Sequence, residues 1–69
     1  MHINPEKLLL SKWRAAIVSN KEKHFIVVDL IRDEQLRTTH CVIEAVLTKN
    51  TQTIQWQQLA DNSQWLPGW

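Results

Sequence analysis

One run of the chain, residues 24–32, constrains the fold most, because it is apolar and rich in β-branched side chains. Such a composition is typical of a β-strand. Alternation along that strand divides its apolar side chains into two sets, Ile26, Val28 and Leu30 on one face and Phe25, Val27 and Ile31 on the other. A strand that is apolar on both faces lies centrally in a sheet or is covered twice. The run therefore predicts a β protein.

Three further segments alternate apolar and polar residues as a half-buried strand does, and they are residues 12–18, 39–48 and 51–59. In the first of them, Trp13, Ala15 and Ile17 share one face. Polar segments separate the predicted strands, and they are residues 19–23, 33–38 and 49–50. Connections this short favour antiparallel neighbours.

The residues near both ends of the chain predict short helical turns. Asn4 is a good cap and Pro5 suits a first helical position, which predicts a turn over residues 5–10. Residues 61–64 resemble a capping box, and the Pro67-Gly68 pair stops the turn. We expect one domain, residues 1–69, mainly β. It is a small antiparallel sheet of about four strands, curled or barrel-like, with Trp65 and Trp69 in a tail that folds back as a lid.

Small chains commonly need an additional source of stability, and the single cysteine cannot form an internal disulfide. The four tryptophans are the candidate substitute, because each aromatic side chain can bury roughly 150–250 Å². Trp13 and Trp56 lie on apolar strand faces and fit that role. The lone thiol suits a reducing compartment, and no apolar run approaches the length of a membrane span or signal-peptide core. We predict a cytoplasmic protein with no membrane partner.

The residues that could carry chemistry are sparse. Cys41 follows His40, but adjacent strand residues point to opposite faces and do not form a nucleophile–base pair. We predict that Cys41 belongs to the core with Ile43 and Leu47. The histidines and the cysteine lack the paired spacing of zinc ligands, and the candidates are His2, His24, His40 and Cys41. We predict no enzyme, cofactor or metal. A thiol-dependent enzyme or redox sensor at Cys41 is the less favoured alternative.

The charge distribution supports a nucleic-acid hypothesis. The net charge is only +1, but residues 1–32 hold six Lys and Arg against three Asp and Glu (+3), and residues 33–69 hold two against four (−2). Cations interleave with an aromatic side chain, as in single-strand binders. The candidate ligand-binding residues are Lys12, Trp13, Arg14, Lys21, Lys23 and His24. The plainer interpretation places Trp13 in the core and the cations on a solvated face.

A second candidate surface is the strand predicted over residues 51–59, which carries no charge. Edge strands without protective charge pair readily with another chain. The candidate interaction edge is Gln55, Trp56 and Gln57. The alternative function is therefore protein–protein interaction or homodimerisation through this edge.

Several spaced motifs also carry a family resemblance. They are Ser11-Lys12-Trp13, Glu22-Lys23-His24-Phe25, Glu44-Ala45-Val46-Leu47-Thr48-Lys49, and Trp56-x-x-Leu59 with Trp65-x-x-Gly68-Trp69. In this order they resemble the small tryptophan-rich family of bacterial conserved hypothetical proteins, over about residues 7–69. That family has no known function, so the resemblance implies no activity, cofactor or catalytic residue.

Overall fold

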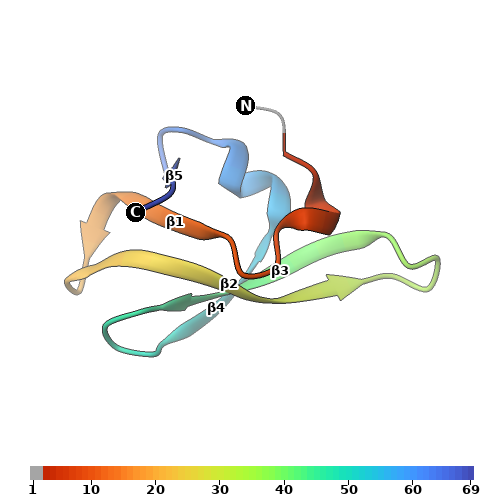
Figure 1. Ribbon diagram of the computed structural model, residues 1–69, viewed down its shortest axis with the longest axis horizontal. Helices are drawn as coiled ribbons and strands as arrows, with labels where there is room; N and C mark the ends of the chain where they lie inside the picture. The colour runs from red at the N-terminus through yellow and green to blue at the C-terminus, as the bar shows by residue number, and fades with distance from the viewer. Residues whose placement is uncertain (1–2) are drawn as a thin grey trace.

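The computed structural model describes residues 3–69. In chain order its elements are η1 (Pro5–Lys7), β1 (Lys12–Ser19), β2 (Glu22–Arg32), β3 (Thr38–Ala45), β4 (Thr51–Gln55), η2 (Trp56–Ala60) and β5 (Trp65–Pro67). The strands form one antiparallel sheet in the order β4-β3-β2-β1-β5 (Figure 1). The mainly β prediction is confirmed, with five strands rather than about four. The sheet is not closed, because β4 and β5 remain its two edges.

The apolar strand is central, as predicted, but its faces change partway along. β2 pairs with β1 on one side and with β3 on the other. The register shifts between Val27 and Asp29, which makes Val28 the extra residue of a β-bulge. Beyond the bulge, Leu30 packs against the core and Ile31 is exposed. The predicted faces are therefore wrong beyond Val27, because one inserted residue reverses the alternation.

The β1–β2 connection is tighter than the predicted loop over residues 19–23. Ser19 pairs with Glu22, so only Asn20 and Lys21 form the turn, and both have positive φ, 55° and 62°. Two left-handed residues are what a hairpin turn that follows the strand twist requires, and Asn tolerates that conformation well. In the same hairpin Ile17 is 80% exposed, because the register with β2 is irregular between Arg14 and Ser19. Its predicted place on the buried face is wrong.

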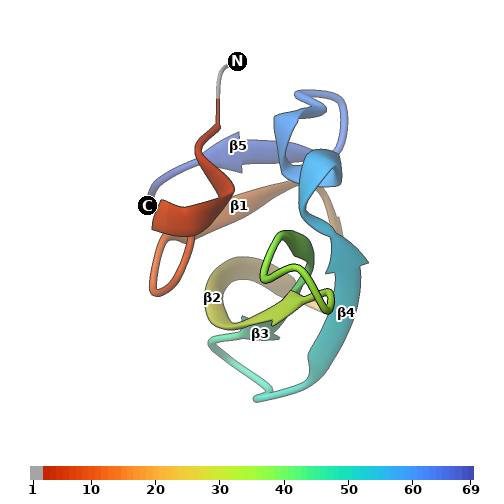
Figure 2. The same cartoon turned by 90° about the vertical axis from the view of Figure 1, so that its right-hand side faces the viewer.

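Two other predicted strands end early. β3 stops at Ala45, so Leu47 lies in a loop and is exposed instead of joining Cys41 in the core. β4 stops at Gln55, and the chain continues into the 3-10 turn η2 rather than as a strand to residue 59. The strand gives way to a turn because η2 packs the side chain of Leu59 against the sheet, where it is fully buried. Figure 2 shows β4 and η2 leading the chain from one edge of the sheet towards β5 at the other.

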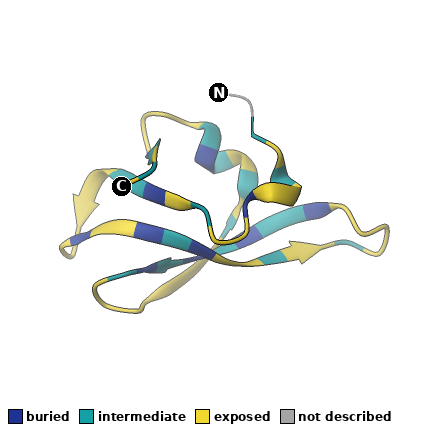
Figure 3. Cartoon of the chain, viewed as in Figure 1, coloured by how far each residue is buried: buried dark blue, intermediate teal, exposed yellow. Residues whose placement is uncertain are grey.

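The core lies on the concave side of the sheet, here called the inner face. Its buried side chains are Leu8, Trp13, Phe25, Val27, Cys41, Ile43, Ala45, Leu59 and Trp65. Figure 3 shows these buried positions along β1, β2 and β3, with the tip of the β2–β3 hairpin exposed. The lid prediction is wrong for Trp65, which lies in β5 opposite Ala15 of β1. The strand places its indole in the core, so the tail extends the sheet.

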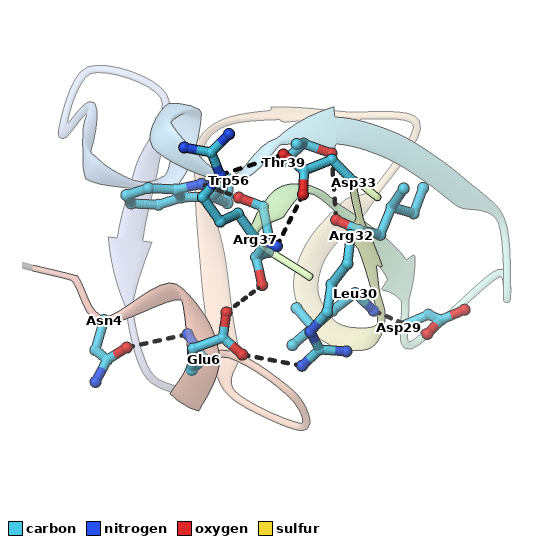
Figure 4. A network of polar contacts seen from close by, with 11 residues as sticks. Asn4, Glu6, Asp29, Leu30, Arg32, Asp33, Arg37, Thr39 and Trp56 are labelled. Atoms are coloured by element: carbon cyan, nitrogen blue, oxygen red, sulfur yellow. Dashed lines mark hydrogen bonds and ion pairs between the residues drawn. The ribbon is translucent and has the colours of Figure 1, made fainter. Parts of the chain in front are cut away.

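The N-terminal turn is held against the β2–β3 hairpin. η1 is shorter than the predicted turn over residues 5–10, and Asn4 Oδ1 accepts the Glu6 backbone N–H at 3.0 Å. The Glu6 carboxylate accepts hydrogen bonds from Thr38 Oγ1 at 2.6 Å and Arg32 Nη2 at 3.1 Å (Figure 4). Asp61 caps the second predicted turn by accepting the Ser63 N–H at 2.9 Å. Across residues 3–69 no helix has the length and apolar character needed to cross a membrane.

Candidate functional site

The largest exposed aromatic group is Trp69, at the end of the chain. Its side chain is 45% exposed, and its Nε1 donates a hydrogen bond to the Phe25 carbonyl at 3.1 Å. Its ring stacks on His24, with 5.0 Å between ring centroids and an interplanar angle of 28°. The Lys12 ammonium lies 4.6 Å from the centroid of the same ring. An indole with one cation over it is thus fixed on the surface.

Local backbone geometry explains how Trp69 reaches this position. The Gly68 N–H donates to the Lys12 carbonyl at 2.8 Å, which continues the β1–β5 pairing by one residue. Gly68 then adopts φ 78°, a left-handed conformation that glycine takes without steric cost. This turn sends the next side chain to the face of the sheet opposite the core, here called the outer face.

Three of the six predicted ligand-binding residues share the outer face. Arg14 pairs directly with His24, and Lys12 lies two positions away on the same side of β1. Trp13, between them, is 5% exposed, and its Nε1 donates to Ser11 Oγ at 2.8 Å. The interpretation of Trp13 as a core residue is therefore confirmed. We call Lys12, Arg14, His24 and Trp69 the Trp69 platform.

The other two predicted cations lie beside this platform. Lys21 and Lys23 line a hollow of about 430 Å³, and His24, Val46 and Leu47 complete its walls. His24 belongs to both the hollow and the platform. The sequence-predicted cations are thus brought onto one continuous surface.

The positive charge of this surface is not neutralised by ion pairs. The ion pairs among residues 3–69 are Arg32–Glu6 and Arg37–Asp33, and neither involves a platform residue, Lys21 or Lys23. The Nε of Arg14 is buried without a hydrogen-bond partner in the described chain. Glu44 lies in the same register row as Lys12, across Ile26, yet the two form no ion pair. A bound anion would meet cations that are not already paired.

Sequence reasoning missed Trp69, which was assigned to a lid. The signal that could have found it is the Pro67-Gly68 pair, because a glycine at the end of a strand permits a change of face. Trp56, by contrast, lies where its apolar strand position suggested, packed against the core. Its Nε1 donates to the Thr38 carbonyl at 3.0 Å.

The predicted interaction edge is only partly a strand. β4 pairs with β3 alone and is an edge of the sheet, and Gln55 is its last residue. Trp56 and Gln57 lie in η2, so they are not part of that edge strand. The exposed edge therefore consists of Thr51–Gln55, which carries no charge.

Cys41, His24 and His40 are the cysteine and the histidines of the described part of the chain. Cys41 is fully buried, and burial raises the pKa of its thiol to about 11. His40 Nδ1 lies 3.0 Å from Thr39 Oγ1. Within the described part of the chain, no three His, Cys, Asp or Glu side chains are grouped as metal ligands. His2 falls outside the described residues.

Comparison with known proteins supplies the family. No curated protein and no solved structure matches the chain. The profile of the family described as tryptophan-rich protein (DUF2389) matches residues 11–69, a range that contains every strand and all four tryptophans. The resemblance seen in the spaced motifs is therefore confirmed, and the chain belongs to this tryptophan-rich family of unknown function.

Proposed function

We propose that this domain is non-catalytic and binds single-stranded nucleic acid, RNA foremost, on the Trp69 platform. The observation that supports this most is the Trp69 indole, which is 45% exposed, stacks on His24 and has the Lys12 ammonium near its ring. Single-strand binders combine aromatic rings, on which bases stack, with cations that contact the phosphates. The four platform residues supply both kinds of group on one surface.

The hollow beside the platform extends this surface. Lys21 and Lys23 offer two further charges close to His24. A flexible single strand with a base against Trp69 can place its neighbouring phosphates along these cations. We expect this activity in the bacterial cytoplasm, since a single free cysteine suits a reducing compartment.

The test is fluorescence anisotropy of a short labelled single-stranded RNA, titrated with the protein at several salt concentrations. Binding should weaken with salt, and each lost phosphate contact should reduce the log–log slope by about 0.7. The double variant Lys12→Ala/Lys23→Ala should therefore bind more weakly and with a shallower slope. Lys7→Ala/Arg37→Ala removes the same formal charge outside the platform and the hollow and is the matched control.

A second pair of variants separates stacking from charge. Trp69→Ala should lose about tenfold in affinity, because stacking one base on an aromatic ring contributes about 1–3 kcal/mol. Trp69→Phe should recover part of that loss. Absence of binding at low salt, or equal affinity of the lysine double variant and its control, would contradict the proposal.

A second candidate function, homodimerisation, is favoured by the free edge at β4. Thr51–Gln55 is an uncharged edge strand, and unprotected edges pair with other strands. Light scattering over a concentration series should then show a dimer that Thr53→Lys dissociates. A strictly monomeric wild-type chain would exclude this candidate.

A further inference from the structure

A second cavity lies between the two edges of the open sheet, on the inner side, away from the Trp69 platform. Its volume is about 320 Å³, within the range of small-molecule sites. β4 contributes Gln52, and the segment entering β5 contributes Gln64 and Trp65. Phe25 and Glu22 line it from β2. The cavity therefore occupies the opening that closure of the sheet would have filled.

Glu22 is the unusual residue of this cavity. It is only 8% exposed, yet no Lys, Arg or His among residues 3–69 forms an ion pair with it. Its Oε2 accepts hydrogen bonds from Thr48 Oγ1 and, at 3.1 Å, from Asn50 Nδ2. Its Oε1 accepts none from the described chain and is not among the buried unpartnered atoms. Oε1 is therefore open to the cavity and free to accept a hydrogen bond from a ligand, and a cation beside it would stabilise a carboxylate in so buried a residue.

The two aromatic side chains that line the cavity, Phe25 and Trp65, indicate what kind of cation fits. Phe25 and Trp65 meet edge to face, with 5.0 Å between ring centroids and an interplanar angle of 89°. Aromatic surfaces accommodate an apolar stem and attract a cation over the ring face. Gln52 and Gln64 also line the cavity, and the oxygen of an amide side chain can accept a hydrogen bond. These groups together suit an ammonium carried on a short alkyl chain.

We propose that this cavity binds a primary alkylammonium group, with Glu22 as its counter-ion and the Phe25–Trp65 wall against its stem. The group is supplied either by a free amine or by a lysine side chain of a partner protein. The site uses no residue of the Trp69 platform, so this proposal does not depend on the proposal of nucleic-acid binding.

The test is an NMR titration of the ¹⁵N-labelled protein, following the Trp indole N–H signals. The probes are n-pentylamine for a free amine, Nα-acetyl-lysine methylamide for a lysine side chain, and n-pentanol as the neutral control. The Trp65 signal should shift with at least one amine and much less with pentanol. Whichever amine binds more tightly identifies the source of the group.

Glu22→Gln is the decisive variant, because its amide oxygen can still accept the hydrogen bonds from Thr48 and Asn50. It should bind the amines about tenfold more weakly or worse, since a charge-assisted bond is replaced by a neutral one. Glu44→Gln removes one carboxylate from the outer face and should bind as the wild type does.

Three outcomes would overturn the proposal: equal binding of pentanol and pentylamine, amine-induced shifts confined to Trp69, or unchanged amine affinity in folded Glu22→Gln. Circular dichroism reports whether that variant folds. If Glu22→Gln does not fold, the proposal is tested on the wild type alone, by comparing pentylamine with pentanol and by locating the amine-induced shifts.

Discussion

Trp65 is 8% exposed on the inner face, whereas Trp69, four residues later, is 45% exposed on the outer face. In a regular strand, residues four apart point to the same side. The difference arises at Gly68, whose φ of 78° interrupts the alternation after β5. One glycine thus separates a tryptophan buried in the core from one that is half exposed on the outer face.

The largest difference in stability should appear between two variants that each truncate one of these tryptophans to alanine. Trp65→Ala removes a core ring and should cost about 3–5 kcal/mol of unfolding free energy, much of the total for a small domain. Trp69→Ala removes a half-exposed ring and one hydrogen bond and should cost about 1 kcal/mol. Urea denaturation followed by circular dichroism measures both. Equal losses of unfolding free energy in the two variants would show that the inner and outer faces do not differ in their contribution to stability.

The burial of tryptophan was predictable where strand alternation is regular and not where it breaks. Trp13 was placed correctly because residues 12–14 alternate without interruption. The prediction for Trp69 is wrong because strand alternation does not reveal that Gly68, the residue before it, has a left-handed conformation. The same limit explains Ile31, since the bulge at Val28 depends on pairing with β3 rather than on the local sequence.

The proposed binding surface was predictable in its charges but not in its aromatic group. Lys12, Arg14 and His24 share a face because β1 and β2 form a hairpin, which local polarity already indicated. The cavity at Glu22 was not foreseen. It needs β4, η2 and β5 to bring Gln52 and Gln64 near the start of β2, and no local pattern encodes that meeting.

The buried thiol offers a second way to sharpen the contrast between the faces. Burial raises the pKa of Cys41 from 9.0 to about 11. The unfolded chain therefore loses its thiol proton first, so stability is intact below pH 9 and falls as pH rises towards 11, by about 2 kcal/mol. Denaturation at several alkaline pH values should show this fall in the wild type and a smaller one in Cys41→Ala. Identical pH profiles would mean that the inner face is open to water.

Gly68→Ala tests the origin of the contrast directly. Apart from Gly68 and its two chain neighbours, no atom lies within 4 Å of the position an added Cβ would take, so the main cost of the substitution is backbone strain. We expect a loss of about 1 kcal/mol from the left-handed conformation. Alternatively the backbone relaxes, and Trp69 then leaves His24, which NMR shifts of the His24 ring report. Gly68→Asn should resemble the wild type, because Asn tolerates positive φ.

The smallest effect should be at Glu6, an exposed group that joins η1 to the hairpin. Its pKa is lowered, first by the hydrogen bond from Thr38 and then by that from Arg32. Because the folded chain holds the charged form more tightly, this contribution is present above the ordinary pKa of 4.5 and disappears as pH falls below it. Glu6→Gln should therefore flatten the acid side of the stability profile slightly.

Asp33 is the control for that experiment, because its pKa is also lowered, by hydrogen bonds within its own loop, from the Arg37 backbone N–H first. Asp33→Asn should flatten the acid profile too, but only Glu6→Gln should also loosen η1, seen as faster hydrogen exchange at the Leu8 amide. Leu8 is 3% exposed and is the residue through which η1 reaches the core. If exchange at Leu8 is equal in both variants, the Glu6 contacts act only as surface electrostatics, and the inner face does not depend on them.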